Sequence, residues 1–323
     1  MNGGGKQRAA FVTGATGCIG SALTERLAGE GWRVTALVRD AVQASFLKQW
    51  PNVELVTGNL AERERIASAM KGCETVFHLA AKVHAAPNTA PLEFTRANVD
   101  GTRNVVAAAI ENRVRHFVLF SSVAVYAESD DVLDETSATL PATAYGASKL
   151  ESERVVMESG LSATVLRLPV VYGRRDRGNV TKLIEAIRRG RYFIVGDGRN
   201  LKSMVAVENV VDAALLATNK QARGAYIVTD ARPYSQAEIA TTIAQLLGCH
   251  RPKHLPRTPL LLAGRAADVV GKLTGVALPI SADRILKLSN NTRFSGDRIE
   301  RELGFKPRVT LREGLAKVIH EKP

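Results

Sequence analysis

The chain has 323 residues, of which 45% are hydrophobic and 24% are charged, and this size suits one large α/β unit with or without a smaller partner. Its three scattered cysteines, Cys18, Cys73 and Cys249, argue against a disulfide framework and favour a reducing compartment, so we expect a cytoplasmic protein. The formal net charge of +12 favours an anionic partner, but the low aromatic content argues against nucleic acid. Charged residues interrupt the most apolar run, residues 259–273, so no membrane span is expected.

The first half of the chain alternates short β-branched runs with longer helical patterns. The six expected strands are residues 9–14, 33–38, 53–58, 74–80, 116–122 and 163–169. The helices expected between the first of them are residues 19–31, 62–72 and 101–113. This alternation predicts an α/β fold with a Rossmann-type doubly wound parallel sheet, and nearly continuous apolar strands are expected where helices cover both faces.

Three glycines, Gly14, Gly17 and Gly20, follow the first expected strand at a spacing of three. Between a strand and a helix, glycines allow a tight turn and a close approach of the backbone to a pyrophosphate, and the helix N-terminus offers free N–H groups. We therefore predict a dinucleotide cofactor at this loop. The cofactor contacts expected here are Gly14, Thr16, Gly17, Cys18, Ile19 and Gly20.

The second expected strand is followed by Arg39 and Asp40, at about the distance from the glycine loop where the adenosine ribose is recognised. An acidic residue there bonds the 2′-hydroxyl of NAD, whereas an arginine suits the 2′-phosphate of NADP. Arg39 favours NADP and Asp40 favours NAD, so both cofactors stay open, and we prefer NADP because of Arg39. An Arg39 side chain that stacks on adenine or faces solvent is the alternative.

Tyr145 and Lys149 are four residues apart at the start of an expected helix, a spacing that places them on one face. A free tyrosine has a pKa of about 10, and a neighbouring ammonium lowers that pKa by favouring the phenolate. The phenol can then exchange a proton with a carbonyl/alcohol pair while hydride moves to or from nicotinamide. Ser121 and Ser122, at the end of the fifth expected strand, supply a hydroxyl that holds the substrate oxygen.

Beyond about residue 171 helical patterns dominate, over residues 179–190, 209–219 and 235–248, with two short strands near 192–198 and 225–230. We expect a dinucleotide-binding domain over residues 1–171 and a smaller, mostly helical substrate lobe over 172–323, interleaved with the sheet. Residues 174–202 carry nine Lys or Arg and three acidic residues. This basic run is either a solvated face or a funnel for an anionic substrate.

These features together resemble the extended branch of the short-chain dehydrogenase/reductase superfamily over almost the whole chain. The motifs are TGxxGxxG at residues 13–20, HLAA at 78–81, SSVAVY at 121–126, YxxxK at 145–149 and LRLPVVYG at 166–173, with Ala127 in place of the usual glycine after SSVAVY. The resemblance implies that Ser122, Tyr145 and Lys149 are catalytic and that Lys149 also holds the nicotinamide ribose. Further cofactor contacts are implied for Asn59, Leu60, Leu79, Ala80, Ala81, Lys82, Asn98, Pro169 and Val170, where Asn59 replaces the family's usual aspartate.

The second half is similar to bacterial UDP-glucose/UDP-N-acetylglucosamine 4-epimerases, in segments such as RGN at residues 177–179 and VENVVDA at 207–213. This resemblance implies NAD(P)-dependent 4-epimerisation of a nucleotide-diphosphate sugar through a 4-keto intermediate. The substrate contacts that it implies are Lys82, Ser122, Tyr145, Asn179, Arg199 and Lys202. Lys202 stands where the group usually has arginine, which forfeits the two-pronged grip on phosphate.

Other functions stay open. An NADPH-dependent reductase of a 4-keto sugar nucleotide, or of an apolar ketone of the steroid or flavonol type, uses the same three catalytic residues. A dehydratase is disfavoured because Val123 and Ala124 occupy the positions of the family's Asp and Glu. A non-catalytic dinucleotide-binding protein usually lacks the Tyr or the Lys.

Members of the extended branch commonly form homodimers, so we expect a homodimer here. No metal site is expected at His84, His116, His250 or His254: Cys249, His250 and His254 have a faint metal-like spacing, but no fourth partner lies nearby at zinc-ligand spacing.

Overall fold

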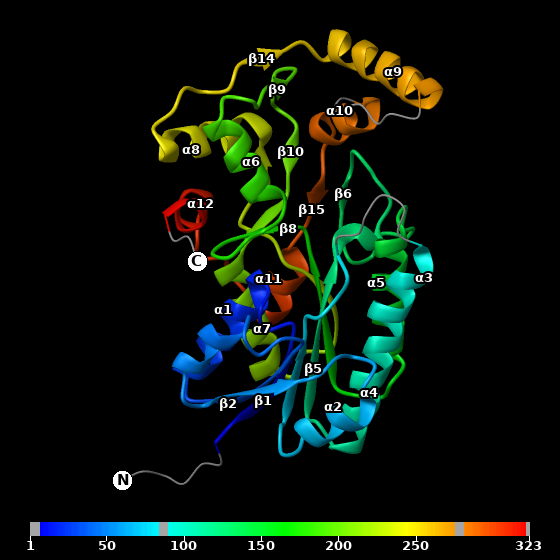
Figure 1. The fold of residues 1–323 in the computed structure, drawn as a ribbon, viewed down its shortest axis with the longest axis vertical. Helices are drawn as coiled ribbons and strands as arrows, with labels where there is room; N and C mark the ends of the chain where they lie inside the picture. The colour runs from blue at the N-terminus through cyan, green and yellow to red at the C-terminus, as the bar shows by residue number, and fades with distance from the viewer. Residues whose placement is uncertain (1–6, 84–89, 275–280, 321–323) are drawn as a thin grey trace.

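A computed structural model describes residues 7–83, 90–274 and 281–320, and Figure 1 shows a lower lobe built on a sheet and an upper lobe made mostly of helices. The sheet has seven strands in the order β12-β7-β5-β4-β1-β2-β3, and every pair in it is parallel. The strands are β1 (Ala9–Thr13), β2 (Arg33–Val38), β3 (Val53–Thr57), β4 (Thr75–His78), β5 (His116–Ser122), β7 (Ala163–Leu168) and β12 (Gly224–Ile227). The predicted fold class and the six predicted strands are confirmed.

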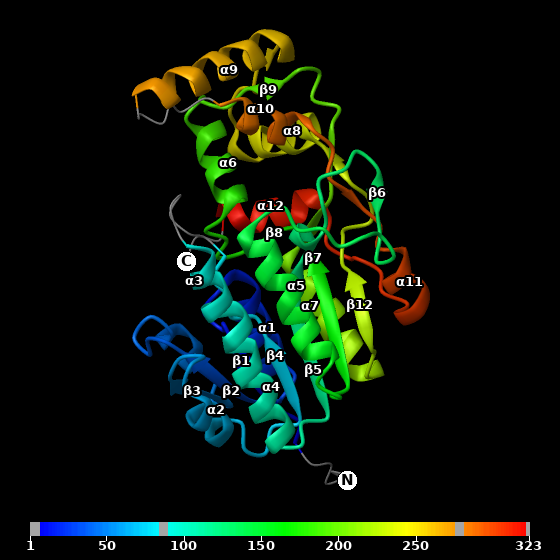
Figure 2. The same cartoon turned by 90° about the vertical axis from the view of Figure 1, so that its right-hand side faces the viewer.

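Helices cover both faces of this sheet (Figure 2), and the strand sequences explain why. In β1, Ala10 and Val12 belong to one apolar core and Phe11 belongs to the other, because successive side chains point to opposite faces. The helices on the first face are α1 (Cys18–Gly29) and α7 (Val207–Lys220), and those on the second are α2 (Arg63–Ala69), α4 (Gly101–Glu111) and α5 (Ala144–Met157). Both faces are buried, so the strands carry apolar residues without alternation.

The order of the strands reverses between β1 and β4, which lie side by side at the centre of the sheet. Parallel sheets of this kind bind ligands beyond the carboxyl ends of the strands at such a switch point. Four short elements follow strands of the sheet along the chain. They are η1 (Ser45–Gln49) after β2, α3 (Pro91–Phe94) and the π-helical turn η2 (Thr95–Asp100) after β4, and η3 (Val123–Val125) after β5. A cofactor is therefore expected beyond the carboxyl ends of β1 and β4.

The upper lobe has its own apolar core, which includes Tyr172, Ile184, Ile243 and Leu315. Its helices are α6 (Asn179–Arg188), α8 (Gln236–Leu247), α9 (Arg257–Thr274), α10 (Ala282–Ser289) and α12 (Leu311–His320). Its strands are β8 (Val170–Tyr172), β9 (Ile194–Val195), β10 (Leu201–Lys202), β11 (Met204–Ala206), β13 (Tyr234–Ser235) and β14 (His254–Leu255). These strands form two-stranded pairs only, β10 with β13, β11 with β8 and β14 with β9, among the residues described.

The chain crosses between the two lobes more than once. After leaving the sheet at β8 it returns as α7 and β12, which extends the sheet beside β7. It returns again as α11 (Asp297–Leu303), whose Ile299 lies in the same core as β1. A fourth pair, β6 (Val132–Leu133) with β15 (Arg293–Phe294), connects the segment after β5 to the C-terminal part. Residues after 171 thus contribute to both lobes.

Candidate active site

The glycine loop lies at the carboxyl end of β1, against the segment that leaves β4. Gly14 has φ +74°, and a Cβ there would lie 2.8 Å from the backbone nitrogen of Ala80. A Cβ on Gly20 would lie 2.1 Å from the carbonyl oxygen of Gly14. Gly17 precedes α1 without a side-chain cap, so N–H groups at this helix end are available to an anion. The loop therefore accepts only glycine at two positions and presents a bare helix N-terminus.

A buried histidine connects the glycine loop to β4. The hydroxyl of Thr13 lies 2.7 Å from Nδ1 of His78 and accepts the N–H of Ala80 at 3.1 Å, and Nε2 of His78 lies 3.0 Å from the hydroxyl of Thr102. Burial, with the positive charge of Lys149 as a smaller cause, lowers the pKa of His78 to about 3. His78 is therefore neutral, and it holds the segments after β1 and β4 in register.

Asn98 fixes the segment that follows β4. Its side-chain oxygen accepts the N–H of Lys82 at 2.6 Å, and its amide donates to the carbonyl of Lys82 at 3.1 Å and to the hydroxyl of Ser148 at 2.8 Å. Asn98 lies in η2, and single π-helical turns are common at functional sites. Both amide hydrogens of Asn98 thus have protein partners, while the Lys82 ammonium pairs with Glu93.

The predicted catalytic tyrosine lies beside Ser122. Thr143 caps α5 by accepting the N–H of Gly146 at 3.0 Å, and a Cβ on Gly146 would lie 2.1 Å from the carbonyl oxygen of Ala124. This close approach brings the start of α5 onto the end of β5. Burial raises the pKa of Tyr145, and a hydrogen bond with the Ser122 side chain opposes that rise. The prediction that the phenol pKa is lowered is wrong in this structure, because burial outweighs the favourable contact.

Lys149 lies one turn further along α5 and is only 4% exposed. Its ammonium donates to the carbonyl oxygen of Phe120 in β5 at 2.6 Å, so it faces the same strand end as Ser122. Burial lowers the pKa of Lys149 to about 8, and the carboxylate of Glu153 limits the fall. The ammonium is therefore the main form at neutral pH.

Glu153, which the motif analysis did not single out, completes this face of α5. Its carboxylate accepts from Ser121 at 2.5 Å and from Nη2 of Arg167 at 2.7 Å, and Arg167 donates to the hydroxyl of Tyr126 at 2.6 Å. Both members of the ion pair are buried. The spacing of Tyr145, Lys149 and Glu153, each four residues from the next, is the sequence signal that could have identified Glu153.

The residues predicted to meet the adenosine end lie in exposed turns after β2 and β3. Oδ1 of Asp40 accepts the N–H groups of Val42 and Gln43 at 2.8 and 3.3 Å, whereas Arg39 is exposed and has no hydrogen bond or ion pair to another described residue. The side-chain oxygen of Asn59 accepts the N–H of Ala61 at 2.8 Å. Arg39 is thus free to meet a ligand, while Asp40 is committed to its own turn.

Four other predicted cofactor residues, Cys18, Leu60, Pro169 and Val170, are packed against neighbouring segments or follow a strand end. The Cys18 thiol donates to the carbonyl oxygen of Arg174 at 3.3 Å, and burial raises its pKa to about 12, so it is not a thiolate. Pro169 and Val170 lie where β7 gives way to β8, and Leu60 packs where a Cβ on Gly101 would stand.

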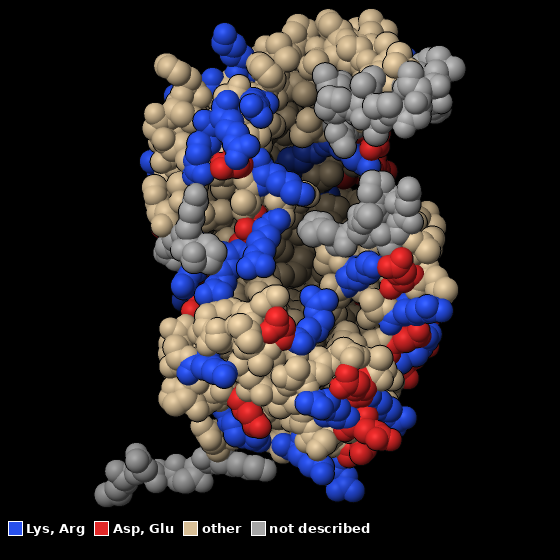
Figure 3. Space-filling view, in the orientation of Figure 1, with Lys and Arg blue, Asp and Glu red and all other residues tan. Residues whose placement is uncertain are grey.

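Basic residues gather along one rim of a hollow between the lobes, seen on the left of the hollow in Figure 3. Asn179 is exposed at the first residue of α6, and Arg199 is exposed in the turn after β9, next to Asp197. Lys202 differs, because its ammonium donates to the carbonyl oxygens of Lys287 and Asn290 at 2.9 and 2.6 Å. Lys202 therefore fastens the end of α10, a role that its position in the sequence did not indicate.

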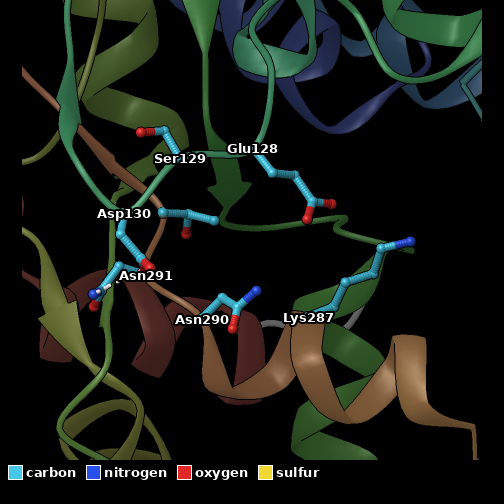
Figure 4. A pocket seen from close by; sticks show the side chains of 7 residues that line it. Glu128, Ser129, Asp130, Lys287, Asn290 and Asn291 are labelled. Atoms are coloured by element: carbon cyan, nitrogen blue, oxygen red, sulfur yellow. Dashed lines mark hydrogen bonds between the residues drawn. The ribbon is translucent and has the colours of Figure 1, made fainter.

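A polar pocket lies at this end of α10 (Figure 4). One side comes from the segment after β5 and the other from α10 and the turn that follows it. The lining residues are Glu128, Ser129, Asp130, Lys287, Asn290, Asn291 and Thr292. The pocket thus lies between the segment after β5 and the end of α10.

The described residues contain no group of three or more His, Cys, Asp or Glu that could hold a metal ion; His84 lies outside the described residues. Within the same part of the chain, none of the helices combines the length and the apolar character that crossing a membrane requires.

Comparison with known proteins gives consistent matches. The sequence model of the NAD dependent epimerase/dehydratase family matches residues 10–228. The chain is 31% identical to the N-acetyl-alpha-D-glucosaminyl-diphospho-ditrans,octacis-undecaprenol 4-epimerase of Escherichia coli O157:H7, over 96% of this chain and 93% of that protein. It is 32% identical to a 4-hydroxy-2-methyl-3-oxo-4-farnesyl-3,4-dihydroquinoline-1-oxide ketoreductase of Stigmatella aurantiaca, over 94% of each. Among solved structures, MoeE5 in complex with UDP-glucuronic acid and NAD is 29% identical, with a TM-score of 0.76 over 96% of this chain and 97% of that one.

Proposed function

This chain belongs to the NAD-dependent epimerase/dehydratase family, and we propose that it is an NAD(P)-dependent enzyme that acts at C4 of a nucleotide-diphosphate sugar. The reaction is 4-epimerisation of a UDP-hexose or a UDP-N-acetylhexosamine through a 4-keto intermediate. The observation that carries the proposal is the packing of the start of α5, which bears Tyr145 and Lys149, on the carboxyl end of β5, where Lys149 donates to the carbonyl oxygen of Phe120 at 2.6 Å. The similarity to a 4-epimerase and to a protein that binds UDP-glucuronic acid and NAD supports it.

The glycine loop fits a dinucleotide, because glycine at positions 14 and 20 lets the loop close tightly on its own backbone and on the segment after β4, and the uncapped N-terminus of α1 offers N–H groups to a pyrophosphate. When bound, an oxidised nicotinamide supplies the hydride acceptor and a positive charge that favours a nearby phenolate. We assign cofactor binding to Gly14, Thr16, Gly17, Cys18, Ile19, Gly20, Arg39, Asn59, Leu60, Leu79, Ala80, Ala81, Lys82, Tyr145, Lys149, Pro169 and Val170. Asn98 acts through Lys82, whose backbone it holds.

Tyr145 is the proton acceptor. Its phenolate takes the proton of the 4-hydroxyl as the C4 hydrogen leaves together with its bonding electron pair, which gives the 4-ketone, and Ser122 donates a hydrogen bond to O4. After the ketone turns its other face, C4 regains this hydrogen with its electron pair and Tyr145 returns the proton to O4, which restores the hydroxyl. Lys149, an ammonium at neutral pH, stabilises the phenolate and holds the ribose.

The basic rim binds the diphosphate. Asn179 and Arg199 are both exposed and are our candidates for this contact, and Lys202 contributes through the third hydrogen of its ammonium or by holding α10 in place. Sugar and diphosphate then span the space from Ser122 to the polar pocket. The carrier is UDP in the structural neighbour and a diphospho-polyprenol in the name of the Escherichia coli relative, so a diphosphate is common to both.

For the cofactor we favour NADP, because Asp40 is engaged with its own turn and Arg39 is the side chain left for the ribose. The bound NAD of the structural neighbour is the argument for NAD. We further propose that residues 1–171 hold the dinucleotide and 172–323 most of the sugar diphosphate. A homodimer through α4 and α5 would cover Ile110 and Met157, which are 50% and 49% exposed.

The test is turnover. Purified protein with NAD+ or NADP+ is incubated separately with UDP-glucose and UDP-N-acetylglucosamine, and the C4 epimers are separated. We expect epimerisation of at least one sugar, and a loss of at least 10³-fold in kcat for Tyr145→Phe. Tyr226→Phe, which removes a phenol hydroxyl on the far side of the sheet lobe, is the control and should keep its rate. Full turnover by Tyr145→Phe would overturn the mechanism.

The second candidate is an apolar ketone reductase, favoured by the similarity to a ketoreductase whose substrate carries a farnesyl chain. The reductase is distinguished from the epimerase by adding an apolar ketone and NADPH as a second reaction. Failure to epimerise either sugar, with rapid oxidation of NADPH by an apolar ketone, would select the reductase over the epimerase.

A further inference from the structure

We propose that the outer face of α9 docks on an anionic lipid surface. This surface, the α9 face, consists of the exposed residues Pro259, Leu262, Ala263, Ala266 and Val270. Their spacing of three and four residues forms one stripe along the helix. Leu262 and Val270 are 61% and 46% exposed, so the stripe is an apolar surface turned toward solvent.

The opposite side of α9 is the side that holds the helix to the protein. A Cβ on Gly264 would lie 2.8 Å from the backbone nitrogen of Ala282 and from Cδ1 of Ile285. The carboxylate of Asp268 accepts the N–H of Ala282 at 3.0 Å. Because α10 takes this side, the stripe faces outward at the end of the molecule farthest from the sheet (Figures 1 and 2).

The charges around the stripe fit anionic headgroups. Arg251, Lys253 and Arg265 are exposed in α9 and the segment before it, whereas Asp268 accepts from Ala282 in α10 and Arg257 donates to Asn290 just after α10. Arginine and lysine beside an apolar stripe can reach headgroup phosphates while the stripe enters the acyl boundary. The chain's net charge of +12 acts in the same direction.

The same features argue against a second copy of the chain as the occupant. Two large apolar side chains are few for a stable protein interface, which buries about 800 Å² on each partner. Two α9 faces brought together would also oppose arginine to arginine. A lipid surface has neither difficulty.

Docking would have a consequence for catalysis that rests on the proposed function. The lobe that carries α9 also forms one side of the polar pocket, through Lys287, Asn290, Asn291 and Thr292. A docked upper lobe would bring this pocket near the headgroup level, where the diphosphate of a polyprenol-linked sugar lies. Binding to lipid itself requires neither turnover nor cofactor.

The experiment is flotation of the full chain with vesicles of phosphatidylcholine containing about one third phosphatidylglycerol, against phosphatidylcholine alone. We expect the protein to float with the anionic vesicles, less at high salt, and the bound fraction to fall at least fivefold in Leu262→Glu. Val42→Glu changes an equally apolar side chain that is 82% exposed in the sheet lobe, and it should bind as the wild type does. Turnover of a soluble UDP-sugar by Leu262→Glu reports folding and stays unchanged.

Three results would overturn the proposal: no flotation of the wild type, equal loss in both variants, or a change of oligomeric state by Leu262→Glu without an effect on flotation. The last would assign the α9 face to a second copy. Loss of UDP-sugar turnover in the wild type with intact flotation would refute the proposed function alone.

Discussion

Glu153 and Arg167 form a buried ion pair, with Oε2 of the carboxylate 2.7 Å from Nη2 of the guanidinium, one helical turn beyond Lys149. The pair joins α5 to β7, and its carboxylate also accepts from Ser121 in β5. Glu153 raises the pKa of Lys149 against the larger effect of burial. The ion pair thus holds the helix that carries the proposed catalytic residues and keeps the lysine charged.

We predict that Glu153→Gln lowers the pH at which the enzyme loses activity on the alkaline side, so that its active pH range becomes narrower. Without the carboxylate the pKa of Lys149 falls further below about 8, so the ammonium is lost at a lower pH and the alkaline limb of kcat/KM moves down. The variant should also lose about 3 kcal/mol of stability, because Arg167 is left buried without its partner. Glu151→Gln, an exposed change on the same helix, is the control. A destabilised Glu153→Gln enzyme with an unchanged pH profile would show that the pair is structural only.

A second prediction concerns acid stability. Burial lowers the pKa of His116 to about 4, and the ring lies between the hydroxyls of Ser162 and Thr164. The folded state keeps this histidine neutral, while the unfolded chain takes up a proton below about pH 6.5. The contribution of His116 to the free energy of unfolding is therefore fully present above about pH 6.5 and is lost as the pH falls toward 4. We expect a loss of about 2 kcal/mol between pH 7 and pH 5.

Urea unfolding at pH 7 and pH 5 measures this loss. His116→Gln should be less stable at pH 7 but should show a pH-dependent loss smaller by that amount. His250→Gln, at an exposed site, is the matched control. Equal pH dependence in wild type and His116→Gln would contradict the assignment.

The sequence predicted those parts of the molecule that depend on local pattern. β1, the glycine loop and the start of α1 follow from an apolar run and three glycines, because each of these signals acts within a few residues. The spacing of Tyr145 and Lys149 predicted one helix face, and α5 presents both toward β5. These are short-range relationships that any fold of this class must preserve.

The remainder depends on contacts between distant segments. Lys202 meets carbonyl groups more than 80 residues away, and no spacing rule reports such a contact. The phenol pKa was predicted from one neighbour, Lys149, whereas burial by several segments decides it. Glu153 was overlooked because its partner Arg167 lies inside a strand that otherwise reads as apolar.

A third prediction concerns the cofactor. Arg39→Asp should raise KM for NADP+ about 10- to 100-fold, because a charged hydrogen bond to the 2′-phosphate is replaced by repulsion. KM for NAD+ should change by less than threefold, since the substituted carboxylate can accept from the ribose hydroxyl. Arg63→Asp, an exposed charge reversal at the start of α2, controls for net charge. An equal rise for both cofactors would assign Arg39 to adenine rather than to phosphate.

The last prediction separates two roles for Lys202. Its ammonium satisfies two carbonyl groups at the end of α10, so Lys202→Met leaves them without a donor and should loosen that end of the helix. We expect faster amide exchange over residues 282–292, with little change in exchange over β1 and β5.

KM for the UDP-sugar should rise in Lys202→Met by a factor that varies little with salt, because the lost contact is between protein groups. Arg199→Met, at the exposed rim, should instead raise KM with a clear salt dependence and leave exchange in α10 unchanged. A Lys202→Met enzyme with normal exchange and a salt-dependent KM would show that this ammonium binds the diphosphate directly.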